Sequence, residues 1–568
     1  MSDQVCDFIM ENLEPNSISL KKASLKTQYA TITDVAQGQN YSSGLVSYNN
    51  IQLQSNENGC VFDLKNAFVH AQMTYTLTAT NAIFLTAANG NPYTTNINAV
   101  TKKSDSHFVH NCWSKLGGVD VTNNNGQGFM NLYMNEKKKE RNPNLSYLEN
   151  DLENFYLDNS TSYITDTVGL EANNNGNTAS SNYNSAIYKR NNYYFDITAS
   201  PIVGFVNTAS MSQYYYPYFT NATQANPSTL QWNDVLTIPL SQLNDIFDKV
   251  PLQMRLNGME LKIQFNGGSA VSYTATCSSA AGSNVATLES ETVNMGNGMT
   301  FPLMLSSLEN QATSALRYTI PNQGQPVTFT LTVQIGWNSN ISPTRILIPY
   351  YKLSNDALNM LDKQKIYSFP VRHCELDTTI TGIAGNSSVV RTLNTHYRSI
   401  RKIYIIPFFS NLNKNGAGTN IIYPYQNPRS SCPNTSAPLR LKQFNVSIAG
   451  NSIFTQETLN YPVQFYNEEF YRLNVEKWSS GNASENPLKS GAIYRKDFLT
   501  CYNVYQVDLD VYENIVEDRE LKSVGLNFQL DGNAQYLYDF FILLECEKYY
   551  ACDAIAGTIQ DISLPSKG

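Results

Sequence analysis

Histidine and cysteine, the side chains that most often carry metal or thiol chemistry, come close together at two places in this sequence. The first place holds Asp105, His107, His110 and Cys112, whose side chains are all of types that bind zinc. Closely spaced residues on one β segment point to alternate faces, however, and no second pair of ligands follows at a recognisable spacing. We therefore predict no metal site at this segment.

The second place is the pair His373 and Cys374, whose residue types are those of a thiol protease. Neighbouring residues of a strand point to opposite faces of the sheet, so the imidazole of His373 cannot take the proton of the adjacent thiol. The sequence therefore predicts no nucleophile and base pair here.

Other catalytic patterns are weak. The pattern Gly126-Gln127-Gly128 does not lie between a strand and a helix of a βαβ unit, and no Walker-type phosphate loop is present in the sequence. Carboxylates are common throughout the chain, so a pair of glycosidase carboxylates stays open, and with it a carbohydrate-active β-sandwich. As a whole the residues predict a protein that is not an enzyme, with no catalytic, cofactor-binding or metal-binding residues.

Charge further restricts the function. The formal net charge of −8 argues against a nucleic-acid binder whose affinity comes from a general basic surface. The most basic cluster, residues 136–141, contains two glutamates and is better explained as a solvated helix end than as a nucleic-acid or subunit contact. Charged residues make up only 15% of the chain, and 37 tyrosines favour broad protein contacts, although tyrosine also simply favours strands.

The expected location follows from the N-terminus and the cysteines. Residues 1–16 are acidic and lack the basic and apolar regions of a secretion signal, and no apolar run approaches the ~20 residues of a transmembrane helix. The nine cysteines are scattered without a CxxC pair, which is typical of buried free thiols in a reducing compartment. The sequence predicts a protein that is made inside a cell and not secreted, without a transmembrane segment.

The elements that position these residues are predicted to be mostly strands. Residues 236–265 have the pattern of a strand, a short helix and a returning strand, and Ser241 is the expected N-cap of the helix. Side chains at the spacing of one helical face, and side chains that alternate along the strand, are expected in a core. These are Leu243, Ile246, Phe247, Leu261, Ile263 and Phe265.

A partial echo of this element occupies residues 505–530. There Gln506-Val507-Asp508-Leu509 corresponds to Thr237-Ile238-Pro239-Leu240, and the later strand again alternates apolar with polar residues. The apolar positions of that strand are Leu526, Phe528 and Leu530. Two units of one β architecture, joined in tandem, explain the echo most simply.

The rest of the chain supports the same class. The alternating strand over residues 329–337 is expected to open the second unit, and Ser354 to cap a helix over residues 355–363. Residues 158–189 and 266–298 are expected to be long polar loops. Many short strands and few helices predict an all-β fold of two tandem jelly-roll barrels with long loop insertions and a few short helices.

The predicted domains follow this division. They are an N-terminal arm at residues 1–44, a first jelly-roll barrel with long loops at 45–300, a second barrel at 301–552 and a C-terminal tail at 553–568.

Several segments together resemble a known family. They are PTRILIPYY at residues 343–351 with the capped helix after it, residues 366–367, the strand at 403–409, LRLKQFNVSIAGNSIF at 439–454, residues 507–509 and the element at 236–265. Over roughly residues 45–550 the chain resembles the double-jelly-roll major capsid proteins of Polinton-like viruses and virophages, with adenovirus hexon a more distant relative.

The resemblance implies a homotrimer of two-barrel subunits, a capsomer with six-fold pseudo-symmetry that tiles an icosahedral virion shell beside neighbouring capsomers. It also implies a penton (vertex) protein and minor capsid proteins as partners, and no catalytic residues. The acidic N-terminus predicts no strong direct nucleic-acid binding. The alternatives are a single-jelly-roll capsid protein with long loops and a β-rich receptor- or carbohydrate-binding fibre protein. The repeated element favours tandem barrels, because a single barrel would need only one.

Overall fold

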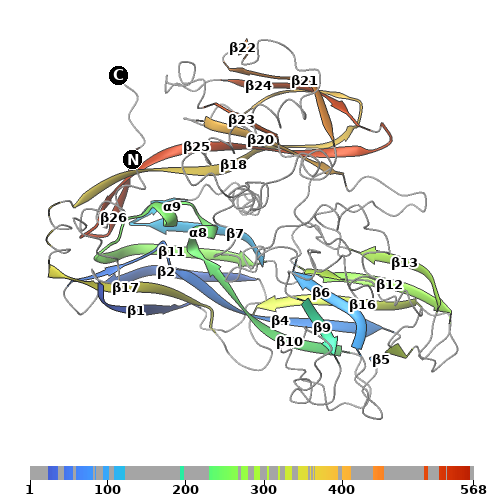
Figure 1. Cartoon of the computed structure of the whole chain (residues 1–568), viewed down its shortest axis with the longest axis horizontal. Helices are drawn as coiled ribbons and strands as arrows, with labels where there is room; N and C mark the ends of the chain where they lie inside the picture. The colour runs from blue at the N-terminus through green and yellow to red at the C-terminus, as the bar shows by residue number, and fades with distance from the viewer. Residues whose placement is uncertain are drawn as a thin grey trace, which may run out of the picture.

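The computed structural model shows a protein built almost entirely of antiparallel strands, arranged as two units that lie one above the other in Figure 1. The structure describes residues 24–35, 44–54, 59–80, 83–84, 94–101, 108–121, 192–196, 229–265, 270–278, 287–294, 303–305, 318–319, 326–335, 343–355, 359, 363, 365–393, 400–410, 439–448, 450–452, 505–509, 523–532 and 534–562. None of the helices in these ranges has the length and apolar character needed to cross a membrane.

The first unit consists of two sheets. The larger has the order β1 (Ser24–Thr33), β17 (Arg345–Leu353), β4 (Phe68–Thr80), β16 (Pro326–Ile335), β12 (Ala270–Ser278) and β13 (Thr287–Asn294), with β10 (Thr229–Pro239) beside β4 and β3 (Cys60–Phe62) beside β17. The smaller has the order β2 (Leu45–Gln54), β11 (Arg255–Phe265), β7 (Val109–Leu116) and β8 (Val119–Asp120).

The second unit also consists of two sheets. One has the order β18 (Ile366–Ala384), β25 (Leu537–Asp553), β20 (Ile400–Phe409) and β23 (Tyr505–Asp508), with β26 (Thr558–Asp561) beside β25. The other has the order β19 (Ser388–Thr392), β24 (Val524–Asp531), β21 (Arg440–Ile448) and β22 (Asn451–Ser452). Two small sheets complete the described strands: β14 (Leu303–Leu305), β6 (Thr94–Thr101) and β9 (Asn192–Asp196), and β15 (Tyr318–Thr319) with β5 (Ile83–Phe84).

The two units have the same connectivity. The row β1, β17, β4, β10 corresponds strand by strand to the row β18, β25, β20, β23, and the row β2, β11, β7 corresponds to β19, β24, β21. In both units the first of these corresponding strands lies beside the last one, β1 beside β17 and β18 beside β25. Taken in chain order, the corresponding strands alternate between the two sheets, which is the arrangement of a jelly roll. Each unit is therefore a jelly roll, and the predicted fold class is confirmed.

The repeated element found in the sequence has the same role in both units. In the first unit the chain leaves β10, passes through α8 (Leu240–Leu243) and α9 (Ile246–Lys249), and enters β11 in the opposite sheet. In the second unit β23 and β24 likewise lie in opposite sheets. Leu240 and Leu509, the corresponding residues that follow β10 and β23, are both buried.

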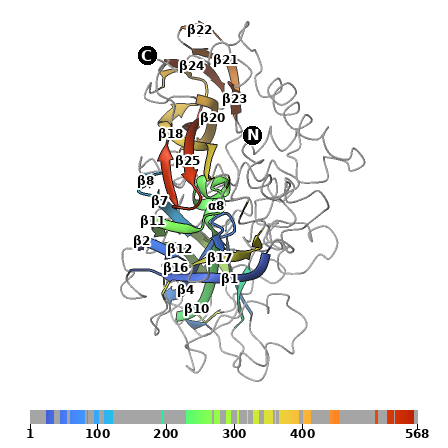
Figure 2. The ribbon, with the colours of Figure 1, turned by 90° about the vertical axis from the view of Figure 1, so that its left-hand side faces the viewer.

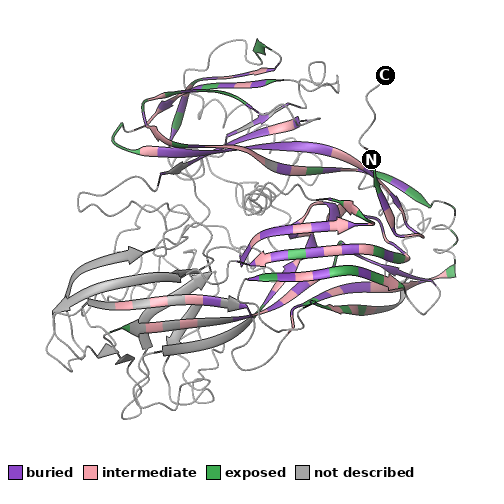
Figure 3. Ribbon diagram, turned by 180° about the vertical axis from the view of Figure 1, so that it is seen from behind, coloured by how far each residue is buried: buried purple, intermediate pink, exposed green. Residues whose placement is uncertain are grey.

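The apolar positions predicted for this element are buried. The residues in question are Leu243, Ile246, Phe247, Leu261, Ile263 and Phe265 in the first unit and Leu526, Phe528 and Leu530 in the second. Figure 3 shows the resulting alternation of buried and exposed positions along the strands of both units. The period of two is local, so it could be read without knowing the fold.

The predicted cap at Ser241 is wrong. The helical stretch is divided into α8 and α9, and the N-cap position of α8 is Pro239, which makes no side-chain capping bond. Asn244 lies between the two helices, where its Oδ1 accepts a hydrogen bond from the backbone N–H of Ile246 at 3.0 Å. Its Nδ2 donates to the carbonyl oxygen of Val121 at 3.3 Å, which ties the helices to the end of the β7–β8 hairpin. A local capping pattern could not foresee this long-range bond.

The predicted domain boundaries also need correction. The strand at 329–337, expected to open the second barrel at residues 301–552, corresponds to β16, which pairs with β4 and β12 in the first unit. β17 pairs with β1 and β4, so the first unit continues to Leu353 instead of ending at residue 300. Strand alternation shows which face of a strand is buried but does not identify its neighbours, because pairing is long-range.

The predicted arm and tail contain strands as well. In the region assigned to an arm at residues 1–44, β1 pairs with β17 along its length, and in the region assigned to a tail at 553–568, β26 pairs with β25. Part of the loop predicted at 266–298 is a hairpin, since β12 pairs with both β13 and β16. These strands contain few large apolar residues, so their sequence pattern is weak, and hydrogen bonding to a neighbouring strand stabilises them.

Some predictions lie partly or wholly outside the described residues. Asn355, Asn359 and Lys363 are helical, in agreement with the helix predicted after Ser354, and the residues between them are outside the description. The basic cluster at 136–141 and the loop at 158–189 also lie outside it.

Candidate functional site

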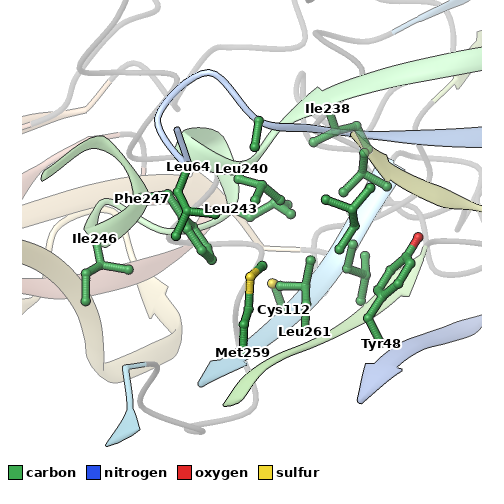
Figure 4. Packing of buried hydrophobic residues seen from close by; sticks show 14 of the residues in the cluster. Tyr48, Leu64, Cys112, Ile238, Leu240, Leu243, Ile246, Phe247, Met259 and Leu261 are labelled. Carbon is green, nitrogen blue, oxygen red and sulfur yellow. The ribbon is translucent and has the colours of Figure 1, made fainter. Parts of the chain in front are cut away.

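The first group of candidate metal ligands is divided by the structure. His110 and Cys112 lie on β7, whereas Asp105 and His107 lie outside the described residues. Cys112 lies in the hydrophobic core of the first unit beside Met259 and Leu261 (Figure 4). Burial raises the pKa of its thiol to about 12, and burial lowers the pKa of His110. Cys112 is therefore a buried core thiol that stays protonated near neutral pH.

No group of three or more His, Cys, Asp or Glu side chains is placed to hold a metal ion within the described ranges. Because Asp105 and His107 lie outside these ranges, the absence of a metal site at this segment stays a prediction.

The second candidate group, His373 and Cys374, is arranged as predicted. Strand register places His373 opposite Cys546 and Cys374 opposite Glu545, so the two neighbouring side chains face opposite sides of the sheet. The thiol of Cys374 donates to Oε2 of Glu545 at 3.9 Å, so its contact is with a carboxylate and not with the imidazole of His373.

Glu545 belongs to a polar group that sequence reasoning missed, which we call the ionic cluster. It comprises Arg372 of β18, Arg401 and Tyr404 of β20, and Glu545, Glu547 and Tyr549 of β25. These side chains lie on the face of the sheet opposite the core of the second unit, which takes the alternate residues of β25, such as Leu544 and Cys546. Glu545 and Glu547 are nevertheless buried.

Glu547 is the centre of the ionic cluster. Its Oε2 accepts from Nη2 of Arg401 at 2.6 Å and from Nε of Arg401 at 3.1 Å, while its Oε1 accepts from Nε of Arg372 at 3.2 Å. The hydroxyl of Tyr549 donates to Oε2 at 3.2 Å. A register shift between Ile400 and Lys402 makes Arg401 the extra residue of a β-bulge, a feature that commonly redirects a side chain.

Glu545 has its own set of donors. The hydroxyl of Tyr404 donates to Oε2 of Glu545 at 2.9 Å, and Nη1 of Arg372 lies 3.9 Å from Oε1. Arg372 thus contacts both carboxylates, and the ionic cluster joins β18, β25 and β20 across the middle of their sheet. The motif Glu545-Cys546-Glu547 within an apolar strand was the only sequence signal of this group, since its arginines come from two distant strands.

The electrostatics of the ionic cluster favour a structural role. Burial alone raises the pKa of Glu547, but the guanidinium groups of Arg401 and Arg372 outweigh burial and hold the pKa below its ordinary value of 4.5. A general acid needs a raised pKa near the working pH. Glu547 therefore remains an ionised acceptor, suited to holding strands together.

The two units meet along a seam formed by the ends of the long strands. On one face of β25, the alternate residues from Tyr538 to Cys546 lie in the second core, whereas Tyr550 and Cys552 lie in the first. Phe369 and Val371 of β18 also join the first core. Figure 2 shows β18 and β25 reaching down to the level of β7 and β8. One pair of strands thus contributes to both cores.

Polar contacts reinforce the seam. The backbone N–H of Met254 donates to the carbonyl oxygen of Ala554 at 2.7 Å, and Nε2 of Gln253 donates to Sγ of Cys552 at 3.0 Å. A small apolar cluster also crosses the seam; it consists of Val61, Leu353, Tyr367 and Ala554.

The outer face of the smaller first-unit sheet carries a shallow hollow of about 390 Å³, bordered by Trp113, Lys115, Glu260 and Lys262 among other residues. Lys115 lies 3.8 Å from Asp120 and 3.9 Å from Glu260; Asp120 is exposed, and the other two side chains are partly exposed. Exposed pairs of this kind contribute little binding energy. Because its acids and bases are balanced, the hollow does not select a ligand of one charge.

Comparisons with known proteins identify which solved structures share this fold. No protein-family model matches the sequence, and no curated protein sequence matches it. By structure, the chain is similar to a chain in the 3.5 Å cryo-electron microscopy structure of the Sputnik virophage, with a TM-score of 0.53 and 11% identity over 98% of this chain and 92% of that one.

Two further structures cover the chain at lower similarity. The mavirus major capsid protein has a TM-score of 0.47 and 10% identity over 96% of this chain and 92% of that chain. The faustovirus major capsid protein has a TM-score of 0.38 and 11% identity over 96% of this chain and 97% of that chain. Together with the strand pairing of the described residues, the match to the virophage chain shows that this chain has a double-jelly-roll fold.

Proposed function

We propose that this protein is a major capsid protein, a structural subunit of a virion shell. The observation that carries the proposal is the tandem repeat of one jelly roll, which matches a chain of a virophage particle over 98% of this chain. The described cysteines fit a structural role, because all of them are buried and Cys374 contacts the carboxylate of Glu545.

The proposed assembly unit is a homotrimer. Each chain supplies two similar barrels, so three chains supply six similar barrels and a nearly hexagonal outline, which allows close tiling with neighbouring capsomers. The low fraction of charged residues and the many tyrosines suit the broad contacts that such a unit needs. A penton protein and minor capsid proteins are the further proposed partners. Because the net charge is −8, we expect no strong direct binding of nucleic acid.

The single-jelly-roll alternative is wrong, because the described strands form two jelly rolls with corresponding connectivity. A fibre protein would differ from a capsid subunit in its assembly and in its binding of a receptor or carbohydrate. Oligomeric state and ligand binding should therefore be measured together.

Light scattering of the purified full-length protein tests the proposal. We expect a mass close to three times 63.6 kDa that persists on dilution through the micromolar range, because obligate interfaces of this type bury more than ~2,000 Å². A glycan array should give no specific binding. A monomer at all concentrations, or a trimer that binds a defined glycan, would favour the fibre protein over the capsid subunit.

A further inference from the structure

The end of the chain forms a hairpin that projects beyond the second barrel. β25 ends at Asp553 and β26 returns beside it. The turn is closed by its own bonds: Oδ1 of Asp553 accepts from the backbone N–H of Ile555 and of Ala556, both at 2.9 Å, and the N–H of Gly557 donates to the carbonyl oxygen of Asp553 at 2.8 Å. The hairpin is thus a self-contained element, built apart from the strands of the first unit.

This hairpin lies directly against backbone of the first unit at two glycines. A Cβ atom at Gly557 would lie well inside 3.0 Å of the carbonyl oxygen of Arg255, at the start of β11. A Cβ atom at Gly117, in the turn between β7 and β8, would lie well inside 3.0 Å of the backbone nitrogen of Ile559. Each turn therefore fits against the other unit only because its glycine has no side chain.

The hairpin also supplies side-chain and backbone contacts to the first unit. Ile559 is 2% exposed and belongs to the first core, and the carbonyl oxygen of Ala554 accepts from the N–H of Met254. In the described pairing β26 is bonded to β25 alone. Releasing the hairpin therefore breaks contacts across the seam without breaking the strand pairing of the first unit.

We propose that the β25–β26 hairpin is a clasp that fixes the angle between the two barrels, and that seating the clasp makes the subunit competent to assemble. The role of the clasp in trimer assembly rests on the proposed function. A capsomer with a nearly hexagonal outline needs the two barrels of each chain at one fixed angle, since neighbouring chains must meet both of them.

The chain offers matched controls for a test. Gly557 and Gly117 have φ of +67° and +58°, and Gly450 and Gly118 have φ of +84° and +86°. All four positions disfavour alanine to a similar degree because of the left-handed backbone. A Cβ atom at Gly450 or Gly118 meets nothing within 4 Å, whereas one at Gly557 or Gly117 meets backbone across the seam. Comparing the pairs separates loss of the clasp from simple backbone strain.

The experiment combines hydrogen exchange with a count of trimers. In full-length Gly557→Ala and Gly117→Ala, we expect the amides of residues 554–561 and of Met254 to exchange at least about tenfold faster than in the Gly450→Ala and Gly118→Ala controls. Strands β4, β11, β20 and β24 should keep their protection, and the trimer fraction should fall at least about tenfold. Equal exchange in test and control variants would overturn the clasp, and fast exchange with an undiminished trimer would overturn its role in assembly.

A second variant covers the case in which the alanine variants do not fold. Ile559→Ser removes an apolar side chain from the seam without backbone strain, and Val390→Ser, at a side chain 72% exposed, is its control. We expect the same selective loss of protection in the hairpin; loss of protection throughout both barrels would contradict a separable clasp. If the parent protein forms no trimer, the proposed function fails, while the exchange of the hairpin still decides whether it is a clasp.

Discussion

Arg401 and Glu547 join two strands of the second barrel, with Nη2 of the arginine 2.6 Å from Oε2 of the carboxylate. The arginine lies at a β-bulge in β20, and the glutamate lies on β25, where Arg372 of β18 reaches its other oxygen. One carboxylate therefore connects three neighbouring strands.

Replacing the central carboxylate should weaken the second barrel. Glu547→Gln keeps the shape of the side chain but leaves two guanidinium groups facing a neutral amide. We expect the free energy of unfolding to fall by about 2 kcal/mol, less than the ~3–5 kcal/mol of a fully buried pair because both arginines keep contact with solvent. Chemical denaturation measures this fall in the free energy of unfolding, and hydrogen exchange in β20 and β25 shows whether these strands lose protection.

A surface pair provides the control for this variant. Lys442 and Asp531 are 2.9 Å apart and both side chains keep substantial contact with solvent, so Lys442→Gln should cost less than ~1 kcal/mol. Equal effects of the two variants would mean that the ionic cluster contributes no more than an ordinary surface pair.

The contribution of Glu547 should depend on pH in one direction. Its pKa in the folded protein is lowered, so its stabilisation is fully present above its unfolded pKa, near 4.5, and is lost as the pH falls through the folded value. Melting temperatures of the parent and of Glu547→Gln, measured from pH 7 to pH 3, should therefore converge below about pH 4.5. A difference that stays constant or widens in acid would contradict this assignment.

The core of the second barrel provides a test of the strand assignment. Leu526 is 1% exposed, and its neighbour Asn527 faces outward from the same strand. Leu526→Asp places an unpaired carboxylate among apolar side chains, and the penalty of several kcal/mol approaches the whole stability of a domain. Soluble protein should be lost in this variant and kept in Asn527→Asp, as judged by size-exclusion chromatography. A soluble Leu526→Asp protein would mean that β24 does not line a core.

The described cysteines should be unreactive in the folded protein. Cys60, Cys112, Cys374, Cys546 and Cys552 are all buried thiols, and burial raises the pKa of Cys112 to about 12. Alkylation at pH 8 requires the thiolate, so mass spectrometry should find these five residues unmodified in native protein and modified in guanidinium chloride. Rapid labelling of Cys112 under native conditions would contradict its place in the core.

The sequence was sufficient for features that depend on local period. The alternation of Leu261, Ile263 and Phe265, and its echo in Leu526, Phe528 and Leu530, identified corresponding strands of two barrels because alternation reports burial directly. It also excluded a pair of His373 and Cys374, since adjacent strand residues face apart.

Features that depend on distant partners could not be predicted in this way. The strand β16 has a clear pattern, yet its place beside β4 is set by residues some 250 positions away, as the register of Thr332 with Thr76 illustrates. The ionic cluster was missed for the same reason, because Arg372 and Arg401 become neighbours of Glu547 only after the sheet has formed. The glycines of the clasp likewise show their purpose only when both turns are in place.

The most direct test of the account is an electron micrograph of the purified full-length protein in negative stain. Averaged particle images should show trimers with a nearly hexagonal outline, in which each chain contributes two adjacent corners. Particles with a plain three-cornered outline, elongated fibres or monomers would contradict the claim that the two barrels of each chain form one side of a capsomer.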